Sequence, residues 1–175
     1  SLATLALLQW SKEHSIKKFI FTSSMGVYAD NLACQVSENS PIEPKSFYGV
    51  EKLSSEEFIR IYTEEGLNAT IFRLFNVYGP GMQSMDYRVM PNFAFRIKEN
   101  LPLEVYGTGK QTRTYCYVTD AITGFLKIFC SGEPGQAYNI GNPNEEISAL
   151  SLAEKFKESA NKKVEILVKD HPPEY

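Results

Sequence analysis

A tyrosine and a lysine four residues apart, Tyr48 and Lys52, are the side chains of this sequence whose types and spacing could do chemistry. They stand at the start of a segment with helical apolar spacing that ends near Gly66. In a helix, residues four apart share one face, so the ammonium is expected to lower the pKa of the tyrosine by Coulombic attraction. A phenol tuned in this way can act as a general base near neutral pH.

The same spacing occurs once more, at Tyr106 and Lys110. Gly107 and Gly109 lie between these two residues and favour a turn over a helix. The side chains of this second pair therefore need not share a face. Because a four-residue spacing arises easily by chance, the first pair needs support from the elements around it.

The elements that would position the pair alternate between helix and strand. Helices are predicted over 1–14, 47–66, 89–98, 120–130 and 148–160, and strands over 17–22, 68–72, 103–106, 114–118, 136–140 and 164–168. Residues 28–46 read as a long loop. This alternation favours a parallel sheet covered by helices, in which ligands bind at the carboxyl ends of the strands. The turn at 23–26 follows the first strand and belongs to such an end.

Composition narrows the class of protein further. The chain has 175 residues, 43% hydrophobic and 13% aromatic, which is typical of a soluble globular protein. A net charge of -3 with mixed signs argues against nucleic acid as a partner. No apolar run reaches the roughly 18 residues of a membrane span and no signal peptide is visible, so a cytoplasmic protein is expected.

Neither histidines nor cysteines suggest a special site. The two histidines, His14 and His171, are isolated, so no metal site is predicted. The three cysteines are too far apart for a Cys-x-x-Cys motif and read as buried or idle thiols in a reducing compartment: Cys34, Cys116 and Cys130.

Several segments, taken in order, resemble one known family. The segments are FTSSMGVY (21–28), YGVEK (48–52), RLFNVYGP (73–80), GTGKQTR (107–113), YVTD (117–120) and YNIG (138–141). They are similar to the extended short-chain dehydrogenase/reductase family, the NAD-dependent nucleotide-sugar epimerases and dehydratases. The resemblance implies NAD as the cofactor, a nucleotide-diphosphate sugar as the substrate, and a partial Rossmann-like doubly wound parallel sheet with a smaller α/β substrate-binding portion.

The resemblance also implies roles for single residues. Ser24, Tyr48 and Lys52 would be catalytic, with Tyr48 taking the proton of a sugar hydroxyl while hydride leaves the same carbon. Each also has a purely structural alternative: Ser24 could be a turn hydroxyl, Tyr48 a ring on the helix surface, and Lys52 a solvated charge. Cofactor contacts are implied for Thr22, Ser23, Tyr48, Lys52 and Phe75, and substrate contacts for Ser24, Asn76, Val89, Arg113 and Tyr115. Phe75 could instead be a core residue, and Arg113 an ordinary exposed arginine.

The chemistry that follows oxidation depends on two positions after Ser24. Dehydratases of the family have an Asp-Glu pair there, and decarboxylases commonly have a Glu in this stretch. In this sequence the positions hold Met25 and Gly26, which transfer no protons. Epimerisation needs only oxidation, rotation of the keto-sugar and hydride return, so it is the favoured reading. The segments 81–82, 86–89 and 92–93 are similar to the decarboxylases, which remain the alternative together with the dehydratases.

A glycine-rich turn for the dinucleotide pyrophosphate, with which the family begins, has no match in the sequence. The chain is therefore expected to be a middle and later part of a longer enzyme. Residues 1–80 would be the second half of the NAD-binding domain, and 81–175 the substrate-binding portion with interleaved Rossmann elements. The resemblance also implies that the helices 1–14 and 47–66 pair in a homodimer. The remaining alternative is an inactive fragment or interaction module.

Overall fold

The computed structural model of the chain describes residues 1–29, 35–83 and 86–170. It divides into two compact units. The first unit consists of residues 1–77 and 119–141, and the second of the described parts of 78–118 and 142–175. The chain thus leaves the first unit after residue 77, returns to it with one helix and one strand, and leaves it again after residue 141.

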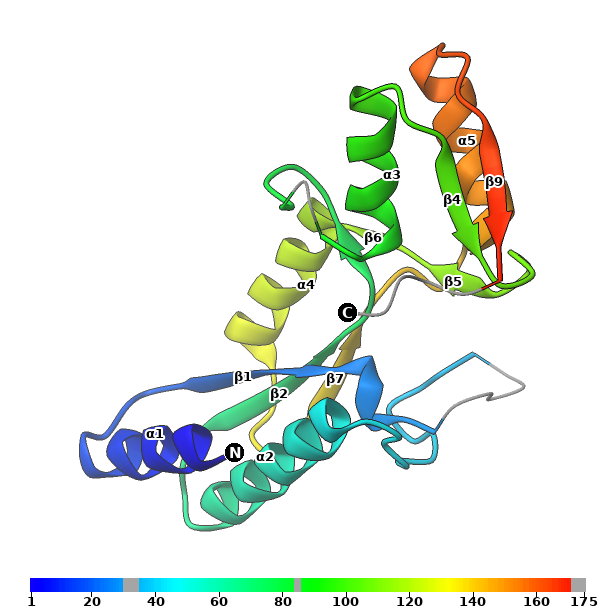
Figure 1. Ribbon diagram of the computed structural model, residues 1–175. Coiled ribbons are helices and arrows are strands. Elements are labelled where there is room, and N and C mark those ends of the chain that lie inside the picture. Colours follow the sequence, from blue (N-terminus) through cyan, green and yellow to red (C-terminus); the bar gives the residue numbers. More distant parts are fainter. Residues whose placement is uncertain (30–34, 84–85, 171–175) are drawn as a thin grey trace. The chain divides into compact units, whose positions relative to one another are not determined.

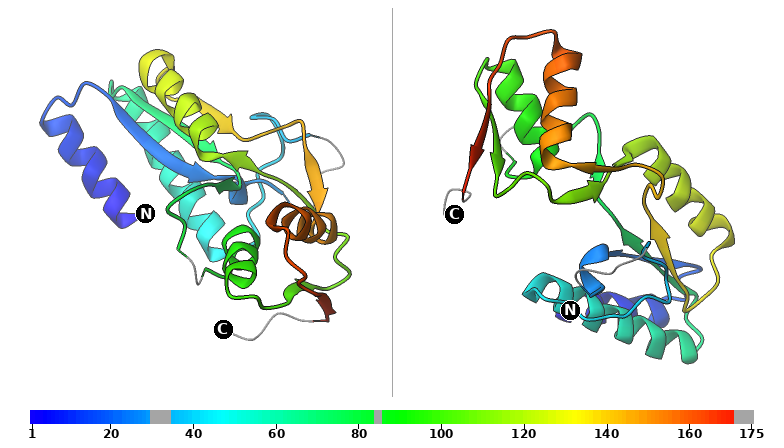
Figure 2. Two further views of the ribbon diagram at one scale, coloured as in Figure 1. Left: turned by 90° about the horizontal axis from the view of Figure 1, so that it is seen from above. Right: turned by 90° about the vertical axis from the view of Figure 1, so that its right-hand side faces the viewer.

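The first unit is a three-layer α/β structure. Its parallel strands are ordered β1 (Phe19–Ser24), β2 (Ala69–Leu74) and β7 (Ala137–Ile140). Helices α1 (Leu2–Glu13) and α2 (Phe47–Glu64) cover one face of this sheet, and α4 (Val118–Ser131) covers the other (Figures 1 and 2). A short 3-10 turn, η1 (Met25–Val27), follows β1 directly. Helices on both faces of a parallel sheet are the doubly wound arrangement that the sequence predicts.

Apolar packing fixes the helices on this sheet. Residues of α1, α2 and β2 form one buried cluster, which includes Leu8, Ile59 and Ile71, all 0% exposed. On the opposite face, the rings of Phe72 in β2 and Phe125 in α4 meet edge to face with centroids 5.5 Å apart. Burial of such side chains contributes roughly 1.5–3 kcal/mol each.

The second unit has its own core. Strands β4 (Leu103–Tyr106) and β9 (Ile166–Lys169) pair in parallel, with α3 (Val89–Lys98) and α5 (Ala149–Ala160) packed against them. Phe93, Leu103 and Val105 are each at most 1% exposed in this core. Three further short strands of the unit are β5 (Thr112–Thr114), β6 (Cys116–Tyr117) and β8 (Glu146–Ser148), and β3 (Val77–Tyr78) pairs with β6 at the junction of the units.

The predicted helices and most predicted strands are confirmed, but the segment 114–118 is not a single strand. Its residues divide between β5 and β6, and α4 already begins at Val118. The division follows from the pairing, because β5 pairs with β8 whereas β6 pairs with β3. The turn predicted between Tyr106 and Lys110 is also present, with φ of +67° at Gly107 and +68° at Gly109.

A carboxylate in the second unit carries a pH-dependent part of its stability. Glu104 accepts hydrogen bonds from Lys169 at 2.6 Å and Tyr106 at 2.7 Å, and Arg96 lies 2.6 Å away. Burial opposes its ionisation, but these hydrogen bonds and positive charges outweigh burial and hold the pKa of Glu104 below its ordinary value of 4.5. A lowered folded-state pKa gives stability that is present above the unfolded pKa and is lost as the pH falls through the folded one.

We therefore expect Glu104→Gln to lower the free energy of unfolding at pH 7 by about 1–2 kcal/mol. The difference from the unchanged chain should shrink as the pH falls below 4.5, the ordinary value for glutamate. Urea unfolding at a series of pH values checks this. Glu99→Gln is the matched control, because Glu99 is exposed and its pairing with Lys98 is loose at 3.8 Å. An equal loss of stability at every pH would contradict the prediction.

Candidate active site

The carboxyl ends of the three parallel strands lie in register. Ser24 at the end of β1 is opposite Leu74 of β2, and Leu74 is opposite Ile140 of β7. The residues that follow these strands therefore leave the sheet along one edge. Phe75 stays tied to this edge, because its N–H donates to the Ile140 carbonyl at 2.9 Å. Such an edge is where ligands bind in open parallel sheets.

Tyr48 and Lys52 lie on the first turns of α2, as the spacing predicts. The hydroxyl of Ser46 caps this helix by accepting a hydrogen bond from the Gly49 N–H at 3.1 Å. The Lys52 Nζ lies 5.5 Å from the centre of the Tyr48 ring. It donates to the Thr22 carbonyl of β1 at 2.9 Å. The lysine is thus held between the tyrosine and the strand.

Ser24 faces the same place. Its Oγ accepts a hydrogen bond from the Gly26 N–H at 3.2 Å. A Cβ at Gly26 would lie 3.5 Å from the Ser24 Oγ and 3.9 Å from Cδ1 of Tyr48. The space beside Gly26 is therefore bordered by two of the three predicted catalytic side chains. Tyr48 is 54% exposed, so its hydroxyl can be reached by a ligand.

Close backbone contact brings the start of α2 to η1. A Cβ at Gly49 would lie 2.3 Å from the Gly26 carbonyl oxygen and 2.9 Å from Cβ of Pro44. No side chain fits at that distance, so only glycine permits this approach. Gly49 thus sets how near Tyr48 comes to the end of β1.

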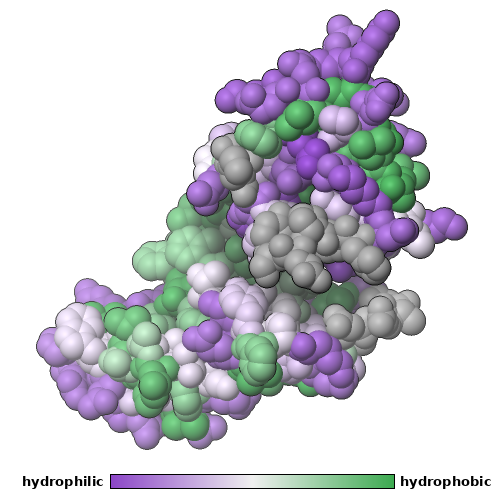
Figure 3. Space-filling model, viewed as in Figure 1, coloured by the Kyte–Doolittle hydropathy of each residue, from purple (hydrophilic) through white to green (hydrophobic). Residues whose placement is uncertain are grey.

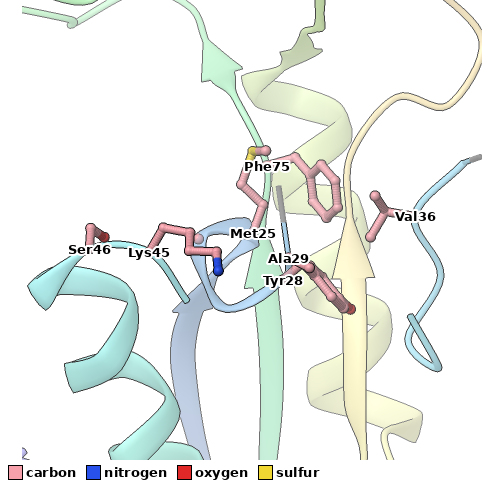
Figure 4. A pocket seen from close by; sticks show the side chains of 8 residues that line it. Met25, Tyr28, Ala29, Val36, Lys45, Ser46 and Phe75 are labelled. Atoms are coloured by element: carbon pink, nitrogen blue, oxygen red, sulfur yellow. The ribbon is translucent and has the colours of Figure 1, made fainter. Parts of the chain in front are cut away.

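A cavity of about 360 Å³ opens beside this cluster. The Phe75 ring and the Met25 side chain border it, and the Lys45 ammonium points toward it from the segment before α2 (Figure 4). Its other lining residues are Gly26, Tyr28, Ala29, Val36 and Ser46. A mostly apolar cavity with one cation suits a ring-shaped polar ligand that also carries apolar faces.

The other residues predicted for cofactor and substrate lie in both units. In the first unit, Phe75 and Asn76 follow β2 at the strand-end edge. Ser23 is 2% exposed and its hydroxyl donates to the buried Glu56, so this hydroxyl is engaged within the protein. Thr22 is exposed and offers its carbonyl to Lys52.

Val89, Arg113 and Tyr115 belong to the second unit. Val89 is the first residue of α3 and packs against the core of that unit. Arg113 is exposed on β5, and Tyr115 is half-buried with its ring edge to face with Tyr78, centroids 6.5 Å apart. Burial raises the pKa of Tyr115, and the charge of Arg113 opposes this only in part.

Two kinds of site have no support in the described part of the chain. Residues 1–29, 35–83 and 86–170 contain no group of three or more histidine, cysteine or acidic side chains that could hold a metal ion. Among the same residues, no helix combines the length and the apolar character that crossing a membrane requires. Of the cysteines described, Cys116 is buried and Cys130 exposed, with no disulfide at either, and Cys34 lies outside the described residues.

The chain is similar to proteins of one family. Residues 1–141 match the model of the NAD dependent epimerase/dehydratase family. The chain is 36% identical over 154 residues to the dTDP-D-glucose 4,6-dehydratase of Bos taurus, covering 87% of the chain and 42% of the relative. It is 33% identical over 179 residues to UDP-glucuronic acid decarboxylase 5 of Arabidopsis thaliana, with 99% and 52% covered.

A solved structure supports the same relationship. The UDP-glucuronic acid 4-epimerase of Bacillus cereus, in complex with UDP-glucuronic acid and NAD, superimposes with a TM-score of 0.87 at 29% identity, covering 97% of the chain and 54% of that protein. The fold thus defines a chain of the Rossmann-type α/β class. The chain belongs to the NAD dependent epimerase/dehydratase family, and it spans about half the length of the curated relatives it matches.

Proposed function

We propose that this chain carries the catalytic centre of an NAD-dependent nucleotide-sugar epimerase. The observation that carries the proposal is that Ser24 and Tyr48 border Gly26, a position that offers no acid or base, while Lys52 lies against the Tyr48 ring. Proton transfer to and from one hydroxyl is then the chemistry that these side chains can perform. An epimerase requires no more than this from its protein.

Tyr48 would take the proton from a sugar hydroxyl as the carbon beneath it loses hydride, and would return the proton after the keto-sugar has turned. Ser24 would donate a hydrogen bond to the reacting oxygen. The Lys52 ammonium would stabilise the phenolate by its charge. When bound, NAD supplies hydride acceptance and return.

The residues present fit this cofactor at its nicotinamide end. An ammonium has three donors, and Thr22 is the one acceptor that Lys52 has among the described residues, so donors remain for ribose hydroxyls. The Phe75 ring at the strand-end cavity offers an apolar wall for a nicotinamide (Figure 4). The main chain of Thr22 and Ser23 would complete these cofactor contacts.

The substrate would be bound by the residues predicted from the sequence. Asn76 would bind near the substrate phosphates at the strand-end edge of the first unit. In the second unit, the exposed guanidinium of Arg113 offers planar paired donors suited to a diphosphate. Val89 and Tyr115 would line the substrate.

A decarboxylase or dehydratase is the second candidate, supported by the two relatives described above. The segment 86–89 forms a local ion pair, in which Arg88 Nε lies 2.9 Å from Oδ2 of Asp86. Hydrogen bonds from Arg88 hold the pKa of Asp86 below its ordinary value. The side chains that would have to donate a proton to the keto-sugar or remove one from it are, however, absent at these two positions, which hold Met25 and Gly26.

Product analysis separates these functions. The protein at its full encoded length would be incubated with NAD and a panel of UDP- and dTDP-sugars, and the products analysed by mass spectrometry and NMR. An epimerase gives a product of unchanged mass with inverted stereochemistry, a decarboxylase releases carbon dioxide, and a dehydratase releases water. Absence of both NAD binding and turnover would leave the interaction-module reading.

The proposal includes a homodimer formed through α1 and α2. Four residues define its proposed surface, the α1–α2 surface: Leu7, Trp10, Val50 and Ile61, each about half exposed. Figure 3 shows hydrophobic atoms over this part of the first unit. A water-exposed apolar surface of this kind is typical of an interface.

A charge on this surface should weaken the dimer. We expect Ile61→Asp to raise the dimer dissociation constant at least about tenfold, because association would then bury a carboxylate. Sedimentation velocity of the full-length protein measures this. Leu126→Asp is the matched control, since Leu126 is 52% exposed on α4, at the opposite face of the sheet. A full-length protein that sediments only as a monomer would contradict the dimer itself.

A further inference from the structure

A buried ion pair joins α2 to the sheet below the catalytic cluster. Arg73 of β2 is 1% exposed and Glu56 of α2 is 0% exposed. The guanidinium donates twice to the carboxylate, from Nε to Oε1 at 3.0 Å and from Nη2 to Oε2 at 2.6 Å. The hydrogen bonds to Glu56 and Tyr28 outweigh burial and raise the pKa of Arg73 above its ordinary value, so the guanidinium is charged.

Hydrogen bonds extend this pair to the strand and turn that carry Ser24. The Ser23 hydroxyl of β1 donates to Glu56 Oε1 at 2.5 Å. Arg73 Nη1 donates to the Tyr28 hydroxyl at 2.8 Å, and that hydroxyl donates to Asn139 of β7 at 2.7 Å. All three strands of the sheet and the helix thus meet in one buried polar network.

The network belongs to a ladder of contacts between α2 and the end of β1. Tyr48, Lys52 and Glu56 are spaced four residues apart, so they follow one another along one face of the helix. Tyr48 lies beside the turn after β1, Lys52 donates to the Thr22 carbonyl, and Glu56 accepts from Ser23. Of these three contacts, the one at Glu56 is fully buried and tied to a second strand.

Stability alone is a weak reason for such a pair. Replacing a buried ion pair by apolar side chains of similar volume is often neutral or stabilising, because two charges need not be desolvated. What apolar side chains lack is the direction of a two-point hydrogen bond. The ion pair fixes how far α2 is shifted and rotated on the sheet, and an apolar replacement leaves this freedom open.

We propose that the Arg73–Glu56 pair is a positioning device, which holds α2 at the one register where Tyr48 and Lys52 face Ser24. This proposal rests on the proposed function for its catalytic consequence. Neither residue touches the substrate; both act through the helix and strand that carry the reacting groups. A displacement of about 1 Å can reduce the rate by about a hundredfold.

The test is a compensating double variant of the full-length protein, Glu56→Leu with Arg73→Met. It removes both charges together and puts apolar side chains of similar volume in their place. The melting temperature should therefore lie close to that of the unchanged protein. We expect kcat to remain at least about tenfold reduced, with little change in the dissociation constant for NAD. Recovery of kcat together with stability would show a purely structural role and overturn the proposal.

A readout independent of turnover separates this proposal from the proposed function. Fluorotyrosine incorporated at Tyr48 should give one narrow ¹⁹F resonance in the unchanged protein and a broadened or divided one in the double variant. If the unchanged protein turns over no nucleotide sugar but the resonances behave as expected, the function fails and the positioning role stands. A single unchanged resonance in the stable double variant overturns the positioning role.

A milder variant covers the case in which the double variant does not fold. Ser23→Ala removes only the hydroxyl that ties β1 to Glu56, and should lower kcat about threefold to tenfold while the free energy of unfolding falls moderately, so that the protein still folds. Ser55→Ala is its matched control, because the Ser55 hydroxyl is equally buried on α2 but donates to Thr4 of α1 at 3.2 Å. Equal kcat for these two variants overturns the proposal.

Discussion

Replacing Tyr48 by phenylalanine is expected to reduce turnover of the full-length protein by about 10²–10⁴-fold, the usual contribution of a positioned acid or base. The free energy of unfolding should change by less than about 1 kcal/mol. This small change follows from the position of the ring, which is 54% exposed and contributes little to the core. Steady-state kinetics and urea unfolding of the same preparation measure both quantities.

The sequence contains its own control for this variant. Tyr106→Phe removes a hydroxyl from the other tyrosine that has a lysine four residues later. Tyr106 lies on β4, and its hydroxyl donates to Glu104. We expect this variant to lose a little stability and to keep its turnover. Undiminished turnover of Tyr48→Phe, or an equal loss in both variants, would contradict the catalytic assignment.

Tyr48→Phe should lose turnover but keep NAD binding, and this is a second test of the catalytic assignment. Phenylalanine keeps the ring, and Lys52 still lies over it and still donates to Thr22. NAD binding, measured by calorimetry, should therefore be nearly unchanged in Tyr48→Phe. A variant that lost NAD binding together with turnover would indicate that the ring only shapes the site.

The elements of the fold could be predicted from the sequence because the signals are local. Apolar spacing places α2 and its pair Tyr48 and Lys52, and the alternation of helix and strand gives the parallel sheet. The separate strands β5 and β6 were missed because each pairs with a distant segment, and such pairing leaves little trace in a run of five residues.

The buried pair of Glu56 and Arg73 was less predictable from the sequence than the candidate catalytic residues. Glu56 reads as one of several polar residues on an amphipathic helix, and Arg73 as a charge near a strand end. Their burial depends on each other, since each is acceptable inside the protein only with its partner. Ser46 could have been found as a helix cap, because a serine stands directly before the helical spacing begins.

Gly49→Ala is the second variant with a large expected effect. Whether it raises or lowers the free energy of unfolding distinguishes two explanations of this position. Alanine is favoured over glycine inside a helix by about 1 kcal/mol, so helix propensity alone predicts a more stable protein. The added Cβ would, however, meet the Gly26 carbonyl oxygen at 2.3 Å and Pro44 at 2.9 Å. The start of α2 and the turn η1 would have to separate, which typically costs about 1–3 kcal/mol.

We therefore expect Gly49→Ala to be less stable than the unchanged protein, and to lose turnover because the start of α2 moves away from Ser24. Gly26→Ala is the matched control, since its Cβ would meet only ordinary contacts at 3.5 and 3.9 Å. This control should keep its stability within about 0.5 kcal/mol. Urea unfolding and kcat of the two variants decide the matter. A Gly49→Ala protein that is more stable and fully active would show that propensity governs this position, and that no close approach of α2 to η1 holds Tyr48 in place.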